Sequence, residues 1–205
     1  MIERAENILQ IAALLFCVGI SHWQAVVHRS RAWVLAAFFF GSYMMGDIFW
    51  MVCLIFYGKT PQISVISDLS WFASYSFLYL LLLQTAPTKA GEKRHWLQWV
   101  GPAVSLALAI YFMQWGEILS NLIYAAIIGL VFFASIGRLV ERDRYRKQRF
   151  LAVMAIVICL MEYGLWFSSC FFEGDSLANP YYWFDLMLTA SCLISLWAIK
   201  KAVAE

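Results

Sequence analysis

The stretch Met113-Gln114-Trp115-Gly116-Glu117 decides whether two long apolar runs are one segment or two. It separates residues 96–114 from residues 116–137, and it is the weakest of the polar breaks between such runs. A bilayer core of about 30 Å needs about 20 apolar residues per helix, so each run is long enough to span it. If this break forms a turn, the chain has seven membrane spans. Without a turn here, the number of spans falls and the topology changes.

The same alternation of apolar runs and short polar breaks extends over the whole chain. The sequence of 205 residues is 63% hydrophobic and 14% charged, whereas soluble domains carry about a quarter charged residues. We therefore predict an all-α membrane protein, a single domain over 1–205 that forms a bundle of seven transmembrane helices in the lipid bilayer. The predicted spans are 7–27, 32–57, 64–85, 96–114, 116–137, 150–172 and 181–199.

Basic residues indicate the orientation of this bundle. Thirteen of the 15 lysines and arginines follow odd-numbered spans, and the other two are Arg4 and Lys59. Lys and Arg concentrate in short cytoplasmic loops. The pattern predicts an N-terminus outside, a C-terminus in the cytoplasm and a multi-pass location in the cell membrane. No nucleic-acid partner is needed to explain these charges.

Acidic residues within the spans are the strongest functional signal. Five helices each bring one carboxyl group to the predicted outer half of the bundle: Asp47, Asp68, Glu117, Glu162 and Asp185. An ionisable group at the centre of a bilayer costs at least ~2.5–3.5 kcal/mol, so such residues face the bundle interior or a watery cavity. No Lys or Arg is predicted at the same depth. These acids are therefore expected to be protonated, hydrogen-bonded, hydrated or neutralised by a bound molecule.

Aromatic residues accompany the acids at helical spacing. Residues three, four or seven apart share one helix face, which pairs Asp47 with Tyr43 and Trp50, Asp68 with Trp71 and Tyr75, and Glu162 with Trp166. Carboxylates attract a cation, and aromatic faces add cation–π attraction. We predict an outward-facing pocket for a small cationic or amphipathic ligand. Its candidate residues are Asp47, Asp68, Glu162, Trp50, Trp71, Tyr75, Trp166, Tyr43, Asp185 and Glu117.

A purely structural role is the alternative for these acids. The chain has 10 Trp, 10 Tyr and 16 Phe, so some aromatic neighbours are expected by chance, and Trp and Tyr also favour membrane interfaces. Tyr hydroxyls and indole N–H groups then simply satisfy protonated acids in a rigid core.

Cysteine and histidine give no sign of a metal or cofactor. The five cysteines fall inside predicted spans without a C-x-x-C motif, which predicts free thiols. The three histidines, His22, His28 and His95, lie near the predicted cytoplasmic side on different segments. We therefore expect neither a metal site nor a bound cofactor.

One part of the sequence resembles a known type of membrane module. The stretches Gly46-Asp47-Ile48-Phe49-Trp50, Tyr57-Gly58-Lys59-Thr60-Pro61 and Ser67-Asp68-Leu69-Ser70-Trp71, with Tyr75, cover about thirty residues. They are similar to the N-terminal multi-spanning sensor module of some bacterial diguanylate cyclases and sensor kinases. The resemblance implies a membrane sensor input. Because the sequence stops at Glu205 without an output domain, such a sensor is expected to signal through a cytoplasmic or membrane partner.

Two other function classes stay open from sequence. Intramembrane acids are also typical of proton- or cation-coupled transporters, which would need a polar path past Ser21 and His22 to the inner face. An intramembrane hydrolase would need a nucleophile and a base within hydrogen-bond reach. A rhodopsin is disfavoured, because the last span has no mid-membrane lysine for a retinal Schiff base.

Overall fold

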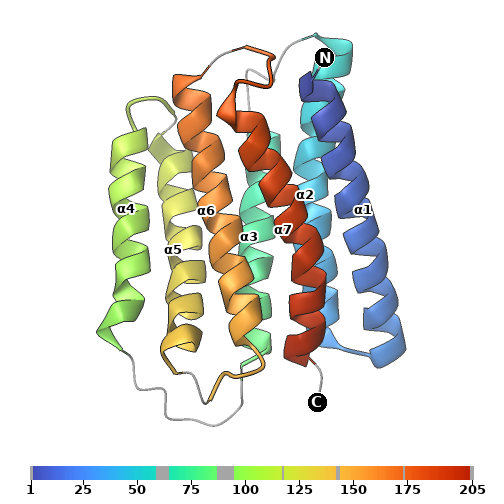
Figure 1. The fold of residues 1–205 in the computed structure, drawn as a ribbon, viewed down its shortest axis with the longest axis vertical. Coiled ribbons are helices and arrows are strands. Elements are labelled where there is room, and N and C mark those ends of the chain that lie inside the picture. Colours follow the sequence, from blue (N-terminus) through green and yellow to red (C-terminus); the bar gives the residue numbers. More distant parts are fainter. Residues whose placement is uncertain are drawn as a thin grey trace.

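The computed structural model describes residues 2–58, 65–86, 95–116, 118–141, 144–172 and 174–203. These residues form seven α-helices and one short 3-10 helix, η1, and they contain no strand. The predicted all-α bundle is therefore confirmed (Figure 1). The elements are α1 (Ile2–His28), α2 (Arg31–Phe56), α3 (Val65–Gln84), η1 (Trp96–Trp99), α4 (Val100–Phe112), α5 (Ile118–Val140), α6 (Arg149–Phe171) and α7 (Pro180–Val203).

Six of these helices are long and apolar enough to cross a membrane, as a multi-pass membrane protein requires. The fourth apolar segment is shorter, because only Trp96–Phe112 is helical. η1 and α4 together extend over about 27 Å, slightly less than a typical hydrocarbon core. α4 nevertheless runs alongside α5 in Figure 1, and returns the chain from the end of α3 to the beginning of α5.

The break after this fourth segment forms the turn that the sequence predicts. α4 ends at Phe112, and the backbone N–H groups of Met113 and Gly116 donate to Ala109 and Phe112 carbonyls at 3.0 and 3.2 Å. α5 then begins at Ile118. Glu117 lies outside the described residues.

Five helices surround the centre of the bundle, and two lie outside this ring. α2, α3, α5, α6 and α7 each contact the next in that order, and α7 closes the ring onto α2. α1 packs on the outside of α2 and α7, whereas α4 packs mainly on α5 and η1 and contacts α6 through the rings of Phe112 and Trp166. Side chains on α2, α3, α6 and α7 can therefore meet at the centre although they are far apart in sequence.

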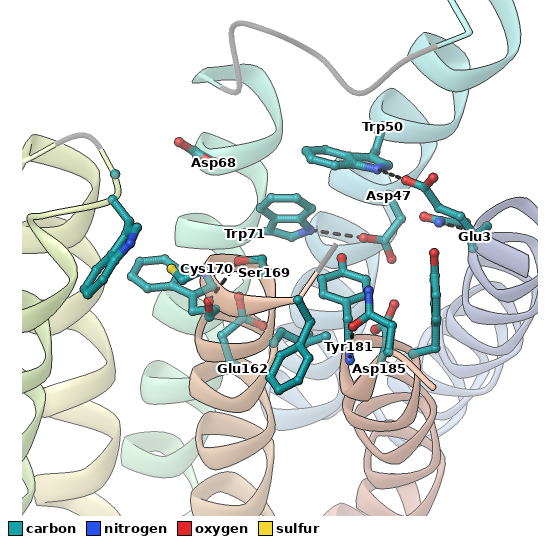
Figure 2. A pocket seen from close by; sticks show the side chains of 18 of the residues that line it. Glu3, Asp47, Trp50, Asp68, Trp71, Glu162, Ser169, Cys170, Tyr181 and Asp185 are labelled. Carbon is teal, nitrogen blue, oxygen red and sulfur yellow. Dashed lines mark hydrogen bonds between the residues drawn. The ribbon is translucent and has the colours of Figure 1, made fainter. Parts of the chain in front are cut away.

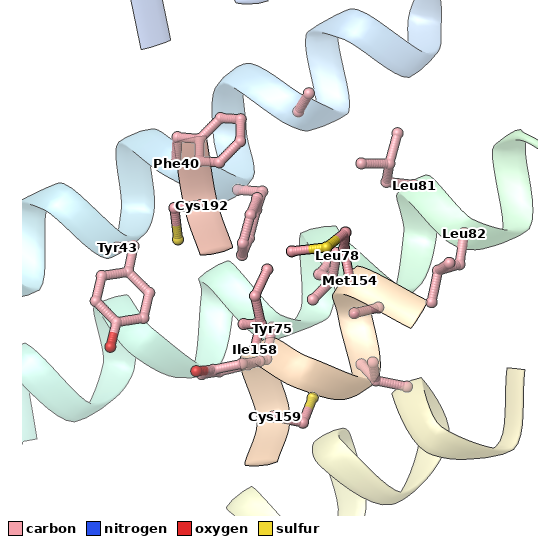
Figure 3. Packing of buried hydrophobic residues seen from close by; sticks show 14 of the residues in the cluster. Phe40, Tyr43, Tyr75, Leu78, Leu81, Leu82, Met154, Ile158, Cys159 and Cys192 are labelled. Carbon is pink, nitrogen blue, oxygen red and sulfur yellow. The ribbon is translucent and has the colours of Figure 1, made fainter. Parts of the chain in front are cut away.

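The half of the bundle that contains the C-terminus has an apolar core. Leu78, Leu81, Leu82 and Ile158 are at most 1% exposed, and Figure 3 shows them packed with Phe40 and Met154. The rings of Tyr43 and Tyr75 lie at one edge of this cluster (Figure 3). All five cysteines are free, as predicted.

Charge separates the two ends of the molecule. We call the end with the N-terminus of α1 the acidic end and the opposite end, with the C-terminus of α7, the basic end (Figure 1). Arg4 is at the acidic end, where its guanidinium donates to the Leu54 carbonyl at 3.0 Å. The basic residues described at the basic end are Arg29, Arg31, Arg138, Arg144, Arg146, Lys147, Arg149, Lys200 and Lys201.

The close packing of α4 on α5 depends on the missing side chain of Gly101. A methyl group at this position is therefore expected to disturb the packing. A Cβ atom at Gly101 would overlap the Cβ atom of Phe132 on α5, which cannot move without its backbone. We expect Gly101→Ala to lower the free energy of unfolding by about 1–3 kcal/mol, a common cost of overpacking. Gly19→Ala is the control, because a Cβ at Gly19 meets nothing within 4 Å. Thermal unfolding in detergent measures both; equal stability of the two variants would contradict the packing argument.

Candidate functional site

A cavity of about 780 Å³ opens among the helices at the acidic end, and all seven α-helices contribute to its wall. Figure 2 shows acidic and aromatic side chains pointing into it from several helices. Eight of the ten predicted residues line this cavity. They are Tyr43, Asp47, Trp50, Asp68, Trp71, Glu162, Trp166 and Asp185. Tyr75 lies directly behind the wall, fully buried, and Glu117 is outside the described residues.

Glu162 forms the floor of the cavity, where it is only 4% exposed. The hydroxyl groups of Tyr43 and Tyr75 both donate to its Oε2 atom, at 3.0 and 2.8 Å. These donors come from α2 and α3, so a single carboxyl oxygen joins three helices. Trp166, one turn along α6, stacks edge-on against Tyr124 with ring centroids 4.4 Å apart. The aromatic wall beside Glu162 is therefore fixed by packing.

Asp47 lies on α2, one turn nearer the acidic end than Tyr43. Its Oδ1 atom accepts from the indole N–H of Trp71 at 3.1 Å, as the dashed line in Figure 2 shows. Its Oδ2 atom is buried and has no donor among the described residues. A buried acceptor without a donor loses the hydrogen bonds that water would provide. Asp47 thus presents an unused acceptor at the wall of the cavity.

Gly46 explains how Trp71 reaches this aspartate. A Cβ atom at Gly46 would lie 2.5 Å from the indole Nε1 atom of Trp71. Only glycine leaves room for the ring to cross the surface of α2 and donate to the neighbouring Asp47. The Gly-Asp pair and the tryptophan on the next helix therefore act as one local structure.

The polar face of α1 was missed by sequence reasoning. The prediction began the first helix at residue 7, whereas α1 begins at Ile2 and includes Glu3 and Glu6. Gln10 donates to Asp185 Oδ1 at 2.5 Å, and Trp50 donates to Glu3 Oε1 at 3.5 Å. The spacing of Glu3, Glu6 and Gln10 is the signal that identifies one helix face.

Asp185 and Glu6 form a carboxyl pair at the side of the cavity. They are 4% and 6% exposed, and their side chains interact across the interface between α1 and α7. Asn7 donates to Glu6 Oε2 at 3.3 Å, whereas Glu6 Oε1 has no donor among the described residues. Two carboxylates this close are not both stable as anions, so the pair is expected to share a proton or a cation.

The connection between α6 and α7 forms part of the cavity's rim and holds α1 in place. Asp175 accepts hydrogen bonds from the backbone N–H groups of Ile2 and Glu3 at 3.2 and 3.1 Å. The Tyr182 hydroxyl also donates to it, at 3.2 Å. A carboxylate at a helix N-terminus satisfies N–H groups that have no partner within the helix. Asp175 therefore caps α1 from a distant part of the chain.

Asp68 is in a different environment on the opposite side of the cavity. It is partly exposed, and the Ser120 hydroxyl on α5 donates to its Oδ2 atom at 3.1 Å. Next to it, the Asn121 amide donates to the Phe112 carbonyl at 3.2 Å and closes the turn between α4 and α5. Asp68 is therefore a hydrogen-bonded residue of the rim rather than part of the buried cluster.

The lining as a whole is rich in hydrogen-bond acceptors and in negative charge. Six acidic residues contribute to it, and the part described contains no Lys, Arg or His. No three His, Cys, Asp or Glu side chains within the described ranges come together as a metal site.

Comparisons with known proteins do not assign the site. No protein-family model, no characterised protein and no solved structure matches this chain. The resemblance to bacterial sensor modules accordingly stays a prediction, and the cavity is interpreted from its own residues.

The two tyrosine hydroxyls on Glu162 give a matched test of the site's architecture. Tyr75→Phe removes a donor from a buried carboxyl, and we expect a loss of about 1–3 kcal/mol in the free energy of unfolding. Tyr124→Phe is the control, because Tyr124 is equally buried but its hydroxyl has no partner among the described residues. Its removal should leave stability unchanged or higher. Equal losses in the two variants, measured by unfolding in detergent, would contradict a specific role for the Tyr75 hydroxyl.

Proposed function

We propose that this chain is a sensor-like binding protein of the cell membrane whose outward-facing cavity takes up a small organic amine. The observation that carries the proposal is the buried Asp47 Oδ2 atom, which lines the cavity without a donor among the described residues. An ammonium group supplies both the positive charge and the N–H donors that this oxygen lacks. Trp50 and Trp71, with ring centroids 6.0 Å apart, offer aromatic surface beside it.

The apolar core beneath the cavity favours binding over transport. Tyr43, Tyr75 and Glu162 close the floor, and fully buried leucines fill the bundle below them. On α1, Leu14 is 1% exposed and separates Gln10 from Ser21. His22 is exposed on the outside of the bundle, so it does not continue a polar path inward. A transporter needs such a path in at least one of its states.

A hydrolase has less support than a binding protein. Ser120 does donate to the Asp68 carboxyl group, which brings a hydroxyl and a carboxylate together. All three histidines of the chain lie at the basic end, away from this pair. The Asp68 carboxylate is a weak base compared with an imidazole, so Ser120 is poorly activated for nucleophilic catalysis.

The contacts of Glu162 suggest how binding in the cavity changes the structure at the basic end. One carboxyl oxygen of Glu162 accepts hydrogen bonds from the hydroxyl groups of Tyr43 on α2 and Tyr75 on α3. A cation that binds near Glu162 therefore competes with both hydrogen bonds at once. Loosening these bonds would release the links that hold α2 and α3 to α6. In this proposal the basic end reports the change to a signalling partner, as the resemblance to sensor modules implies.

The proposed orientation predicts which loops an impermeant reagent can reach. In a variant without the native cysteines, we expect Ser176→Cys to be labelled in intact cells. Lys147→Cys should be labelled only after permeabilisation, because basic loops remain in the cytoplasm. Both residues are exposed in the structure. If only the Lys147→Cys variant were labelled in intact cells, the proposed orientation would be wrong.

The amine proposal predicts ligand-dependent stabilisation through Asp47. Saturation with a ligand at about 100 times its dissociation constant stabilises the native state by about 2.7 kcal/mol. We expect a panel of amines, screened by thermal unfolding, to contain compounds that raise Tm, whereas their neutral alcohol analogues do not. Asp47→Asn should remove the shift without lowering the stability of the free protein.

Glu141→Gln serves as the charge-matched control, since Glu141 pairs with Arg144 at the basic end. It should keep the amine response. If no amine of the panel raises the Tm of the parent protein, the binding proposal fails.

A further inference from the structure

A second, smaller groove lies at the basic end, between the beginning of α6 and the end of α7. It measures about 280 Å³ and is lined by Arg146, Arg149, Phe150, Val153 and Lys201. Three cationic side chains and two apolar ones therefore share one small site. It is remote from the acidic cavity and has the opposite charge.

The cations of this groove differ from other arginines nearby. The guanidinium of Arg138 donates to the Ala134 and Leu82 carbonyls, and Arg144 lies 3.7 Å from the Glu141 carboxylate. In contrast, Arg149 has a buried Nε atom without an acceptor in the described part of the chain. None of the three groove cations has a carboxylate partner there either. Their hydrogen-bonding capacity is therefore available to an anion.

The groove continues into an apolar surface on the outside of the bundle. The ring of Phe150 packs edge-on against Trp197, with centroids 4.9 Å apart. Lys201 Nζ lies 5.5 Å above the same tryptophan ring. Trp197 is 59% exposed and Val153 is 40% exposed. On a membrane-spanning helix, such residues face lipid chains, and tryptophan is typical of the headgroup level.

We propose that this groove binds the phosphate group of an anionic phospholipid in the leaflet at the basic end. Arg146, Arg149 and Lys201 surround the phosphate, because guanidinium groups match its oxygen geometry and the ammonium adds a point charge. The acyl chains lie along Val153 and Trp197. A lipid bound here joins the beginning of α6 to the end of α7.

Lipid retention by the purified protein tests this site. Native mass spectrometry would compare the parent in detergent with added phosphatidylglycerol or phosphatidylcholine. We expect retention of phosphatidylglycerol over phosphatidylcholine. The double variant Arg149→Gln/Lys201→Gln should weaken retention by about tenfold or more, since it removes two charge-assisted contacts.

The matched control is Arg31→Gln/Lys200→Gln, which removes the same two charges from exposed positions at the basic end outside the groove. It should retain phosphatidylglycerol as the parent does. If both double variants lost phosphatidylglycerol retention equally, the effect would be general electrostatic attraction and the proposed site would be wrong. Displacement of the lipid by millimolar inorganic phosphate would instead assign the groove to a soluble phosphate group and overturn the lipid proposal.

Discussion

A carboxyl group inside a membrane bundle must obtain its hydrogen bonds from the protein, and Glu162 obtains two from tyrosines on other helices. This requirement constrains the rest of the structure. The two hydrogen bonds link α2 and α3 to α6 at the middle of the bundle, and they mark the boundary between two different halves. Towards the acidic end the helices enclose a polar cavity, whereas towards the basic end they pack around leucines and isoleucines.

The helical bundle was predictable because membrane helices require long apolar runs, and the polar breaks between them are clear in this sequence. The end of α4 at Phe112 and the turn over residues 113–116 were predictable for the same reason. The beginning of α1 was placed too late, because Glu3 and Glu6 are charged residues that hydropathy assigns to the membrane surface. They lie in the bundle because they face Trp50 and Asp185 rather than lipid.

Eight of the ten residues predicted for the cavity do line it, but their hydrogen-bond partners were not predictable. Helical spacing places Tyr43 beside Asp47 and Tyr75 beside Trp71, yet both tyrosines donate to Glu162. Asp47 instead accepts a hydrogen bond from the indole N–H of Trp71. This bond is possible because Gly46 has no side chain to block the indole ring. Periodicity shows which residues share one face of a helix. The opposing helix is decided by packing across the bundle, which a single sequence does not reveal.

Buried acceptors without hydrogen-bond donors lower the stability of the half of the bundle at the acidic end, and this cost bears on function. Asp47 Oδ2 and Glu6 Oε1 are buried acceptors without donors among the described residues, and each such group costs about 1–3 kcal/mol. A protein selected for stability alone would replace these acids or add donors beside them. The floor shows that this chain can provide such donors, because Glu162 has two. Asp47 lines the cavity, where an incoming molecule can supply the missing donor, and this supports the proposed binding role.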